Sequence, residues 1–128
     1  MNPDYLKTRF RFSAPPEGLP ASFAVITACN PDGVPISPDE NAARTEAFRS
    51  QLAECGHRIF PVTGFDPDSP HHEAGFGVVC EKSTALGFGR QWEQDAIFWV
   101  EDGDVWIVSC IDPSEEVILG NWVSLADP

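Results

Sequence analysis

The sequence predicts an α+β fold: a ferredoxin-like βαββαβ sandwich, with one mostly antiparallel sheet backed by two helices and an extra C-terminal hairpin strand. Three observations predict it: short apolar runs rich in β-branched residues, two segments with helical signals, and the alternation of these two kinds of segment along the chain. The length of 128 residues is usual for one domain, so we expect a single domain over residues 1–128.

The expected strands begin at "RFRF", residues 9–12, where charged and aromatic residues alternate as they do in a half-buried edge strand. A Pro-rich stretch follows, so residues 1–20 are expected to form an N-terminal edge strand and a connection. The run "SFAVITAC", residues 22–29, is nearly continuously apolar and ends before Asn30-Pro31. It is predicted to be a central strand.

A complete helix start follows in "SPDENAARTEAFRSQLAECG". Ser37 is the predicted N-cap, Glu40 closes a capping box three residues later, and Gly56 ends the helix. At roughly 100° per residue the helix is expected to carry one apolar stripe. The stripe is made by Phe48, Leu52 and Cys55. Asn41 projects almost along the same line, so a polar side chain is expected to point inward.

The remaining elements complete the predicted order. "HRIFPVTG" and "GFGVVC" read as strands, and a second helix is expected from Ser83 to about Gln94. Gly75 and Gly77 alternate along one strand face, which indicates either the close approach of a backbone or ligand, or helix packing. "DAIFWVEDGDVWIVSC" predicts a hairpin that turns at Asp102-Gly103, and the tail is expected to add a further strand.

In this topology the ends of several strands and the start of the first helix meet at one sheet edge. The polar residues at these junctions are Thr27, Asn30, Asn41, Glu73 and Gln94. We expect them to line one concavity that binds, and is a candidate to act on, a small polar ligand. Enclosure would raise the pKa of Glu73, which makes it the candidate catalytic base, and the other four are the candidate ligand-binding residues.

Structural interpretations of the same residues stay open. Asn30 before Pro31 also suits a turn, Asn41 could be satisfied by a backbone carbonyl, and Glu73 could be a solvated loop residue. The sequence "HHE" at 71–73 lacks a third ligand at metal-binding spacing, so neither a metal nor a cofactor is expected. The amino end of the first helix favours an anionic or carbonyl-bearing ligand.

The charge distribution predicts an alternative function. Net charge is −12, and after Arg90 the chain has nine Asp or Glu residues and no Lys or Arg. Direct nucleic-acid binding is therefore not expected. The alternative is an acidic protein-interaction module, such as an inhibitor, an immunity-type protein or a nucleic-acid mimic, that acts on a basic protein partner through the face after Arg90. Whether the protein is an enzyme stays open.

Location and assembly are also expectations from composition. No run approaches the roughly 20 apolar residues of a membrane span, and the N-terminus lacks the apolar run of a signal peptide. The four cysteines are scattered, with no C-x-x-C pair. We therefore expect a cytoplasmic protein without structural disulfides, not associated with a membrane, that is a monomer or a weak dimer.

Four stretches carry a family resemblance: "ITACNPDG", "ENAARTEAFRSQL", "FPVTGFDPD" and "LGFGRQWEQDAIFWVEDG". Together they resemble the uncharacterised bacterial family catalogued as domain of unknown function 3293, over roughly residues 23–103. The matching positions are Thr27, Ala28, Asn30, Pro31, Glu40, Asn41, Gly64, Glu73 and Gln94. The chain departs from the family pattern at Gly75, where a serine is expected, and at Glu93, where a small residue is expected. The resemblance implies a shared fold and a shared polar edge, but no assigned reaction.

Overall fold

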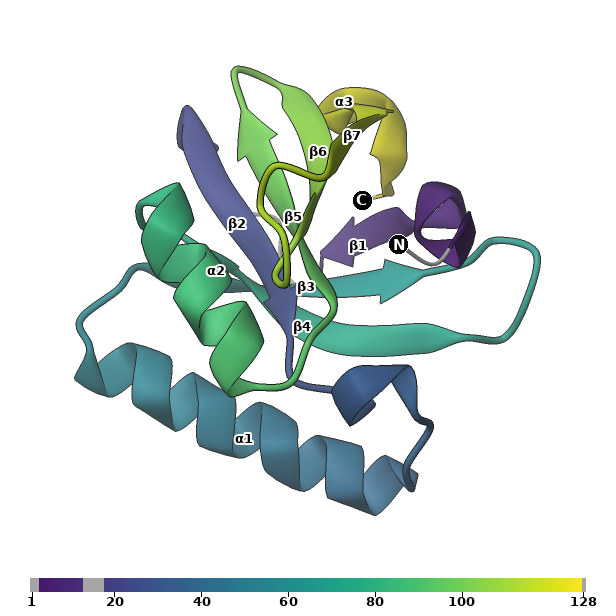
Figure 1. Ribbon diagram of the computed structural model, residues 1–128, viewed down its shortest axis with the longest axis vertical. Coiled ribbons are helices and arrows are strands. Elements are labelled where there is room, and N and C mark those ends of the chain that lie inside the picture. The colour runs from purple at the N-terminus through teal and green to yellow at the C-terminus, as the bar shows by residue number, and fades with distance from the viewer. Residues whose placement is uncertain (1–2, 13–17, 128) are drawn as a thin grey trace.

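The computed structural model describes residues 3–12 and 18–127, which form one eight-stranded sheet with the two longer helices on its outer side (Figure 1). In sheet order the strands are β7 (Glu116–Asn121), β6 (Asp104–Ser109), β5 (Ala96–Glu101), β2 (Ser22–Thr27), β4 (His72–Val78), β3 (Ile59–Phe65), β1 (Arg9–Phe12) and β8 (Ala126–Asp127). Strands β1 to β7 pair antiparallel, and β8 pairs in parallel with β1. The sheet curls into a half-barrel.

The helical segments are α1 (Pro38–Glu54), α2 (Lys82–Gln91), α3 (Trp122–Leu125), and the 3₁₀ turns η1 (Pro3–Lys7) and η2 (Pro31–Gly33). The predicted capping box of α1 is confirmed, because the Glu40 backbone N–H donates to Ser37 Oγ at 3.1 Å and the Ser37 N–H donates to Glu40 Oε1 at 3.4 Å. Gly56, with φ of 77°, follows the helix end. Within the described residues, no helix has the length and apolar character needed to cross a membrane.

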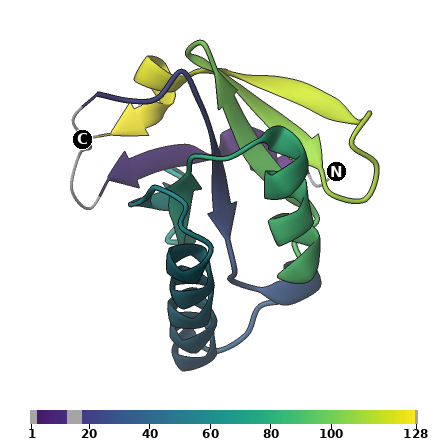
Figure 2. The same ribbon diagram turned by 90° about the vertical axis from the view of Figure 1, so that its left-hand side faces the viewer.

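The predicted ferredoxin-like sandwich is wrong, because apolar side chains are buried on both faces of the sheet. On the outer face α1 and α2 contribute Phe48 and Leu86 to one core cluster that includes Ile26 (Figure 2). On the inner face Phe23 belongs to a second cluster, which is closed by α3. A two-layer sandwich leaves one face of its sheet open, whereas this sheet curls over the second cluster and becomes a half-barrel.

The inner cluster is aromatic, and it is closed by the C-terminal tail. The indole of Trp122 packs on Phe10 with ring centroids 5.0 Å apart and on Phe23 at 5.2 Å. A β-carbon at Gly77 would overlap the ring of Phe60, so an aromatic side chain, rather than a helix, occupies the space above this glycine. The short helix α3 was not predicted from the tail sequence, where only a strand was expected.

Two further local expectations differ from the structure, and one is confirmed. Cys55 caps the end of α1 and is exposed, so it does not continue the apolar stripe of Phe48 and Leu52. Strand β1 is the second strand from its end of the sheet, because β8 pairs outside it. The predicted hairpin is confirmed, and its turn residues Asp102 and Gly103 have φ of 50° and 86°. Most of the Pro-rich connection, residues 13–17, lies outside the described residues.

Candidate functional site

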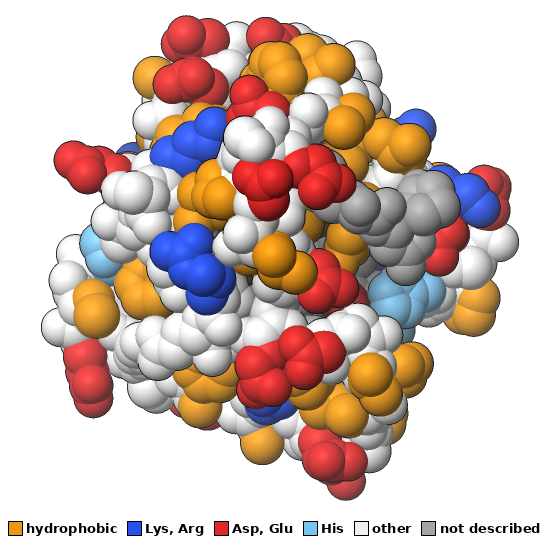
Figure 3. Space-filling model, in the orientation of Figure 1, with side chains coloured by type: hydrophobic (Ala, Val, Ile, Leu, Met, Phe, Trp, Pro, Cys, Tyr) orange, Lys and Arg blue, Asp and Glu red, His pale blue; other side chains and the backbone are white. Residues whose placement is uncertain are grey.

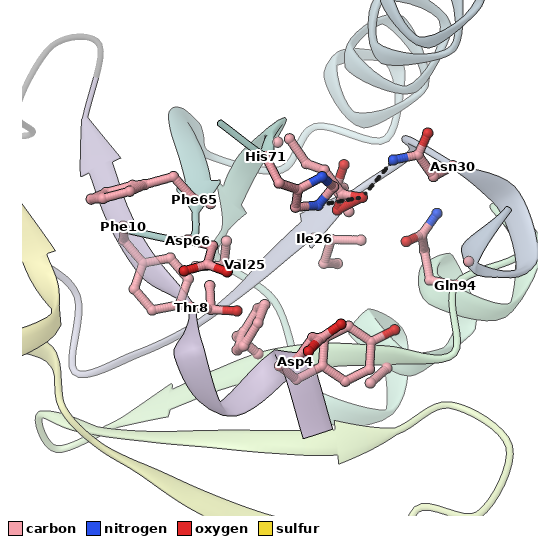
Figure 4. A pocket seen from close by; sticks show the side chains of 18 of the residues that line it. Asp4, Thr8, Phe10, Val25, Ile26, Asn30, Phe65, Asp66, His71 and Gln94 are labelled. Carbon is pink, nitrogen blue, oxygen red and sulfur yellow. Dashed lines mark hydrogen bonds and ion pairs between the residues drawn. The ribbon is translucent and has the colours of Figure 1, made fainter. Parts of the chain in front are cut away.

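A pocket of about 450 Å³ opens on the inner side of the half-barrel, at the end of the sheet where β2 ends and β4 and β5 begin (Figure 4). Its apolar floor is shared with the inner aromatic cluster through Phe10 and Val25. Four of the predicted site residues line it, namely Thr27, Asn30, Glu73 and Gln94. Asn41, the fifth, is not among the residues that line it.

Asn41 instead holds the turn that carries Asn30. Asn30 adopts the left-handed conformation with φ of 49°, which Asn tolerates better than most residues. Asn41 Nδ2 donates to Asn30 Oδ1 at 2.9 Å, and Asn41 Oδ1 accepts the backbone N–H of Asn30 at 2.9 Å. The Ile36 N–H also donates to Asn30 Oδ1. This bonding fixes the Asn30 amide and points its nitrogen toward the pocket.

Other polar groups tie the same loop to its neighbours. Thr27 Oγ1 donates to the carbonyl of Ala74 at 2.8 Å and accepts the N–H of Cys29 at 3.0 Å. Gln94 Nε2 donates to the carbonyls of Cys29 and Trp92, both at 3.0 Å. The Thr27 hydroxyl and the Gln94 amide nitrogen therefore hold the loop, even though both residues border the pocket.

Sequence reasoning missed Arg44, which joins the same assembly from one turn further along α1. Its Nε donates to the carbonyl of Ala28 at 2.6 Å and its Nη2 to the carbonyl of Trp92 at 2.7 Å. The guanidinium also lies 3.5 Å from the Glu93 carboxylate and 5.4 Å from the Trp92 ring. The i, i+3 spacing from Asn41 was the available signal, since both face one side of the helix.

Glu73 lines the pocket and has an unused hydrogen-bond acceptor. Its Oε1 accepts a hydrogen bond from Asn30 Nδ2 at 3.0 Å, and His71 Nε2 lies 3.8 Å from the same oxygen (Figure 4). No described residue donates to Oε2, and no fully buried polar side-chain atom lacks a partner among the residues described, so Oε2 keeps accessible surface. Burial raises the pKa of Glu73, although the Asn30 bond and the charge of His71 oppose the shift.

Tyr5 and Asp95 are pocket residues that sequence reasoning did not find. Tyr5 comes from η1, and Asp95 precedes β5. Burial, helped by the charges of Asp95 and Glu73, raises the pKa of Tyr5 to about 12. The hydroxyl therefore stays protonated at neutral pH, within electrostatic reach of both carboxylates. Nothing in "MNPDYLK" indicated that η1 would cover this end of the sheet.

The lining limits the chemistry of the pocket. In the described part of the chain, no three His, Cys, Asp or Glu side chains gather into a group able to hold a metal ion. No residue of α1 lines the pocket, so the amino end of that helix does not provide the anion site expected from the sequence. His71, which precedes β4, lies beside Glu73, whereas His72 Nδ1 lies 3.1 Å from the carbonyl oxygen of Pro70.

The acidic residues after Arg90 are divided along the β5–β6 hairpin. Glu101, Asp102 and Asp104 lie at its tip, whereas Asp112 and Glu116 lie beyond its other end. Glu116 pairs with Lys82 at 3.0 Å. On the face that Figure 3 shows, acidic side chains are interspersed with basic and hydrophobic ones and form no continuous patch. Action on a basic partner through this region stays a prediction.

Comparison with known proteins places the chain in a family without assigning it an activity. No curated protein and no solved structure shows significant similarity to it. A family model described as protein of unknown function (DUF3293) matches residues 26–97, inside the range over which the sequence resembles that family. The match contains all five predicted site residues and Asp95, whereas Tyr5 lies outside it. The chain belongs to the DUF3293 family.

Proposed function

We propose that this domain binds a small molecule with a polar end and an apolar body in the pocket, and that Glu73 is the group that exchanges a proton with it. One observation carries the proposal: Glu73 lines a cavity of about 450 Å³, its Oε1 is held by Asn30, and its Oε2 has no donor among the described residues. A carboxylate positioned through one oxygen and free at the other is suited to accept a proton from a bound molecule.

The fixed surroundings of Glu73 support the same proposal. Asn41 and the Ile36 N–H saturate the acceptor of Asn30, so its amide nitrogen is directed at Glu73. The cavity floor is apolar, which limits the water around the carboxylate and favours its protonated form. Pre-organised polar groups above an apolar floor are typical of small-molecule sites.

Binding is tested by nuclear magnetic resonance of the ¹⁵N-labelled protein with a library of neutral, cationic and anionic small molecules. Ligands are expected to shift the amide signals of residues 27–30, 73–75 and 94–96. Glu73→Gln, which keeps an acceptor for Asn30, should weaken binding of the hits by about tenfold or more. Glu101→Gln, at the far end of β5, is the matched control and should leave binding unchanged. Ligands that bind elsewhere, or whose affinity is unchanged by Glu73→Gln, would refute the proposal.

Proton exchange has its own test. The carboxyl carbon signal of Glu73, followed by ¹³C resonance during a pH titration, should show a midpoint above the ordinary value of 4.5. A bound ligand that exchanges a proton with Glu73 should move this midpoint. A midpoint at or below the ordinary value in the free protein, unchanged by ligand, would argue against a role in proton transfer.

A further inference from the structure

The described lining of the pocket has more acidic than basic side chains. Its lining includes four carboxylates, and none of the described lining residues is Lys or Arg. They are Asp4, Asp66, Glu73 and Asp95. Asp66 already accepts the backbone N–H of Asp68 at 2.8 Å. Glu73 Oε2 and the whole Asp95 carboxylate receive no hydrogen bond from any described residue, so two acidic groups face the cavity with unused acceptors.

Two nearby arginine side chains lie outside the pocket. Arg11 borders the adjoining groove and lies over the ring of Phe65, with 4.4 Å between the guanidinium carbon and the ring centroid. Arg44 is committed to the carbonyls of Ala28 and Trp92. Neither of these two lines the pocket. Among the described lining residues, an anionic ligand would therefore meet two carboxylates with no Lys or Arg beside them and with only His71 as a basic group.

Aromatic rings form the other part of the wall. Tyr5 packs edge-on against Phe98 with centroids 6.4 Å apart, and Phe10 packs edge-on against Phe98 at 5.0 Å. All three line the pocket, as does Phe65. Aromatic faces attract cations and also bury apolar groups, so this wall suits a molecule that has both.

We infer that the pocket selects an organic cation: a protonated amine whose ammonium group lies between Glu73 and Asp95 and whose apolar body lies against the aromatic wall. The inference rests on the proposed function and names its ligand class. An ammonium group has three donors, which can serve the free oxygens of both carboxylates together. A bare metal ion fits less well, because a metal site needs more ligands than these two carboxylates supply.

Three probes of matched shape test the inference: 2-phenylethylammonium, 2-phenylethanol and 3-phenylpropanoate. They share a phenyl ring and a two-carbon spacer but end in a cation, a neutral hydroxyl and an anion. Dissociation constants are measured at neutral pH from the pocket amide shifts. The ammonium probe should bind about tenfold or more tightly than the alcohol, and the carboxylate probe should bind weakest. Raising the salt concentration should weaken the binding of the ammonium probe appreciably, but not the binding of the other two.

Variants separate this inference from the proposed function. Asp95→Asn should weaken binding of the ammonium probe about tenfold and leave binding of the alcohol unchanged. Asp104→Asn, which removes one charge at the hairpin tip, should change the affinity for neither probe. If the alcohol or the carboxylate binds as tightly as the ammonium probe, or if Asp95→Asn has no effect, the cation inference fails while the pocket stands. If none of the three probes shifts the pocket amides, the cation inference and the proposed function fail together.

Discussion

The two sides of the Asn30 turn differ in how completely their polar groups are paired. On the side toward α1, the Asn41 amide and the Arg44 guanidinium form hydrogen bonds with Asn30 and with the carbonyls of Ala28 and Trp92. Toward the cavity, Glu73 and Asp95 retain acceptors without a donor among the described residues. The role of a hydrogen-bonded polar group is explained by its contribution to the stability of the fold. An enclosed polar group without a hydrogen bond does not stabilise the free protein. The candidate chemistry therefore belongs to the cavity side.

The largest expected effect is on the paired side, at Arg44. Arg44→Ala should lower the free energy of unfolding by about 2–3 kcal/mol, because it leaves the carbonyls of Ala28 and Trp92 without their charge-assisted donors. Urea denaturation measures the loss. Arg44→Lys keeps the charge but not the planar fork, and should recover only part of the stability. Full recovery with Lys would mean that charge alone, rather than the two-carbonyl geometry, holds the loop.

Asn41→Ala should have the next largest effect, a loss of about 1–3 kcal/mol in the free energy of unfolding. The substitution removes the acceptor for the Asn30 N–H and a donor to Asn30 Oδ1. It also frees the amide that holds Glu73, so the Glu73 carboxyl titration should change although Asn41 does not line the pocket. Asn41→Asp, which retains the acceptor, is the matched variant. A stable Asn41→Ala protein with an unchanged Glu73 titration would contradict this coupling.

Most strands and the two longer helices could be placed from the sequence, but α3, η1 and the architecture could not. The capping box at Ser37 and the Asp102-Gly103 turn are local signals, and each is confirmed. The predicted sandwich is wrong because "SFAVIT" is apolar on both faces of the sheet, and each apolar face needs a cover. The second cover comes from distant segments around Phe10 and Trp122, whose approach no local pattern indicates.

The candidate site shows the same division between local and long-range information. Thr27, Asn30, Glu73 and Gln94 could be brought to one place from the order of strands, since each stands at a strand end. Asn41 was expected to point inward and to line the cavity, but its side chain bonds Asn30 and does not line the pocket. Tyr5 could not be found, because η1 reaches the pocket only through the curl of the sheet.

Glu73→Gln should change the free energy of unfolding less than Asn41→Ala does, and the change should depend on pH. The folded-state pKa of Glu73 is raised above 4.5, so the folded protein holds this proton more tightly than the unfolded chain does. The stabilisation is fully present below 4.5 and is lost as the pH rises through the folded-state pKa. Glu73→Gln removes the dependence and should gain stability relative to the wild type as the pH rises.

Urea denaturation of both proteins from about pH 4 to about pH 8 measures this difference. His71→Ala is a second arm, because the charge of His71 lowers the pKa of Glu73 and its removal should make the loss of stability extend to higher pH. A wild type that gains stability relative to Glu73→Gln as the pH rises would mean that the carboxylate is better stabilised in the folded protein than in water. The polar groups that face the cavity would then have partners, and the difference from the α1 side would not exist.

The smallest expected effect on stability is at Tyr5. The chain has one tyrosine, so the ultraviolet absorbance of tyrosinate reports this residue alone. Its ionisation should have a midpoint near 12 in the folded protein, compared with 10.0 for the ordinary side chain. Since no described residue bonds the hydroxyl, Tyr5→Phe should change the free energy of unfolding at neutral pH by less than about 0.5 kcal/mol.

The carboxylates beside Tyr5 make this titration a probe of the cavity. Asp95→Asn and Glu73→Gln should each lower the midpoint, because the negative charge of each group helps to raise the Tyr5 pKa, after burial itself. Asp104→Asn, at the hairpin tip, should leave it unchanged. A midpoint near 10.0 in the folded protein would place the hydroxyl in water, away from both carboxylates. The aromatic wall would then be open at η1, and the enclosed negative pocket that distinguishes this side of the Asn30 turn would not exist.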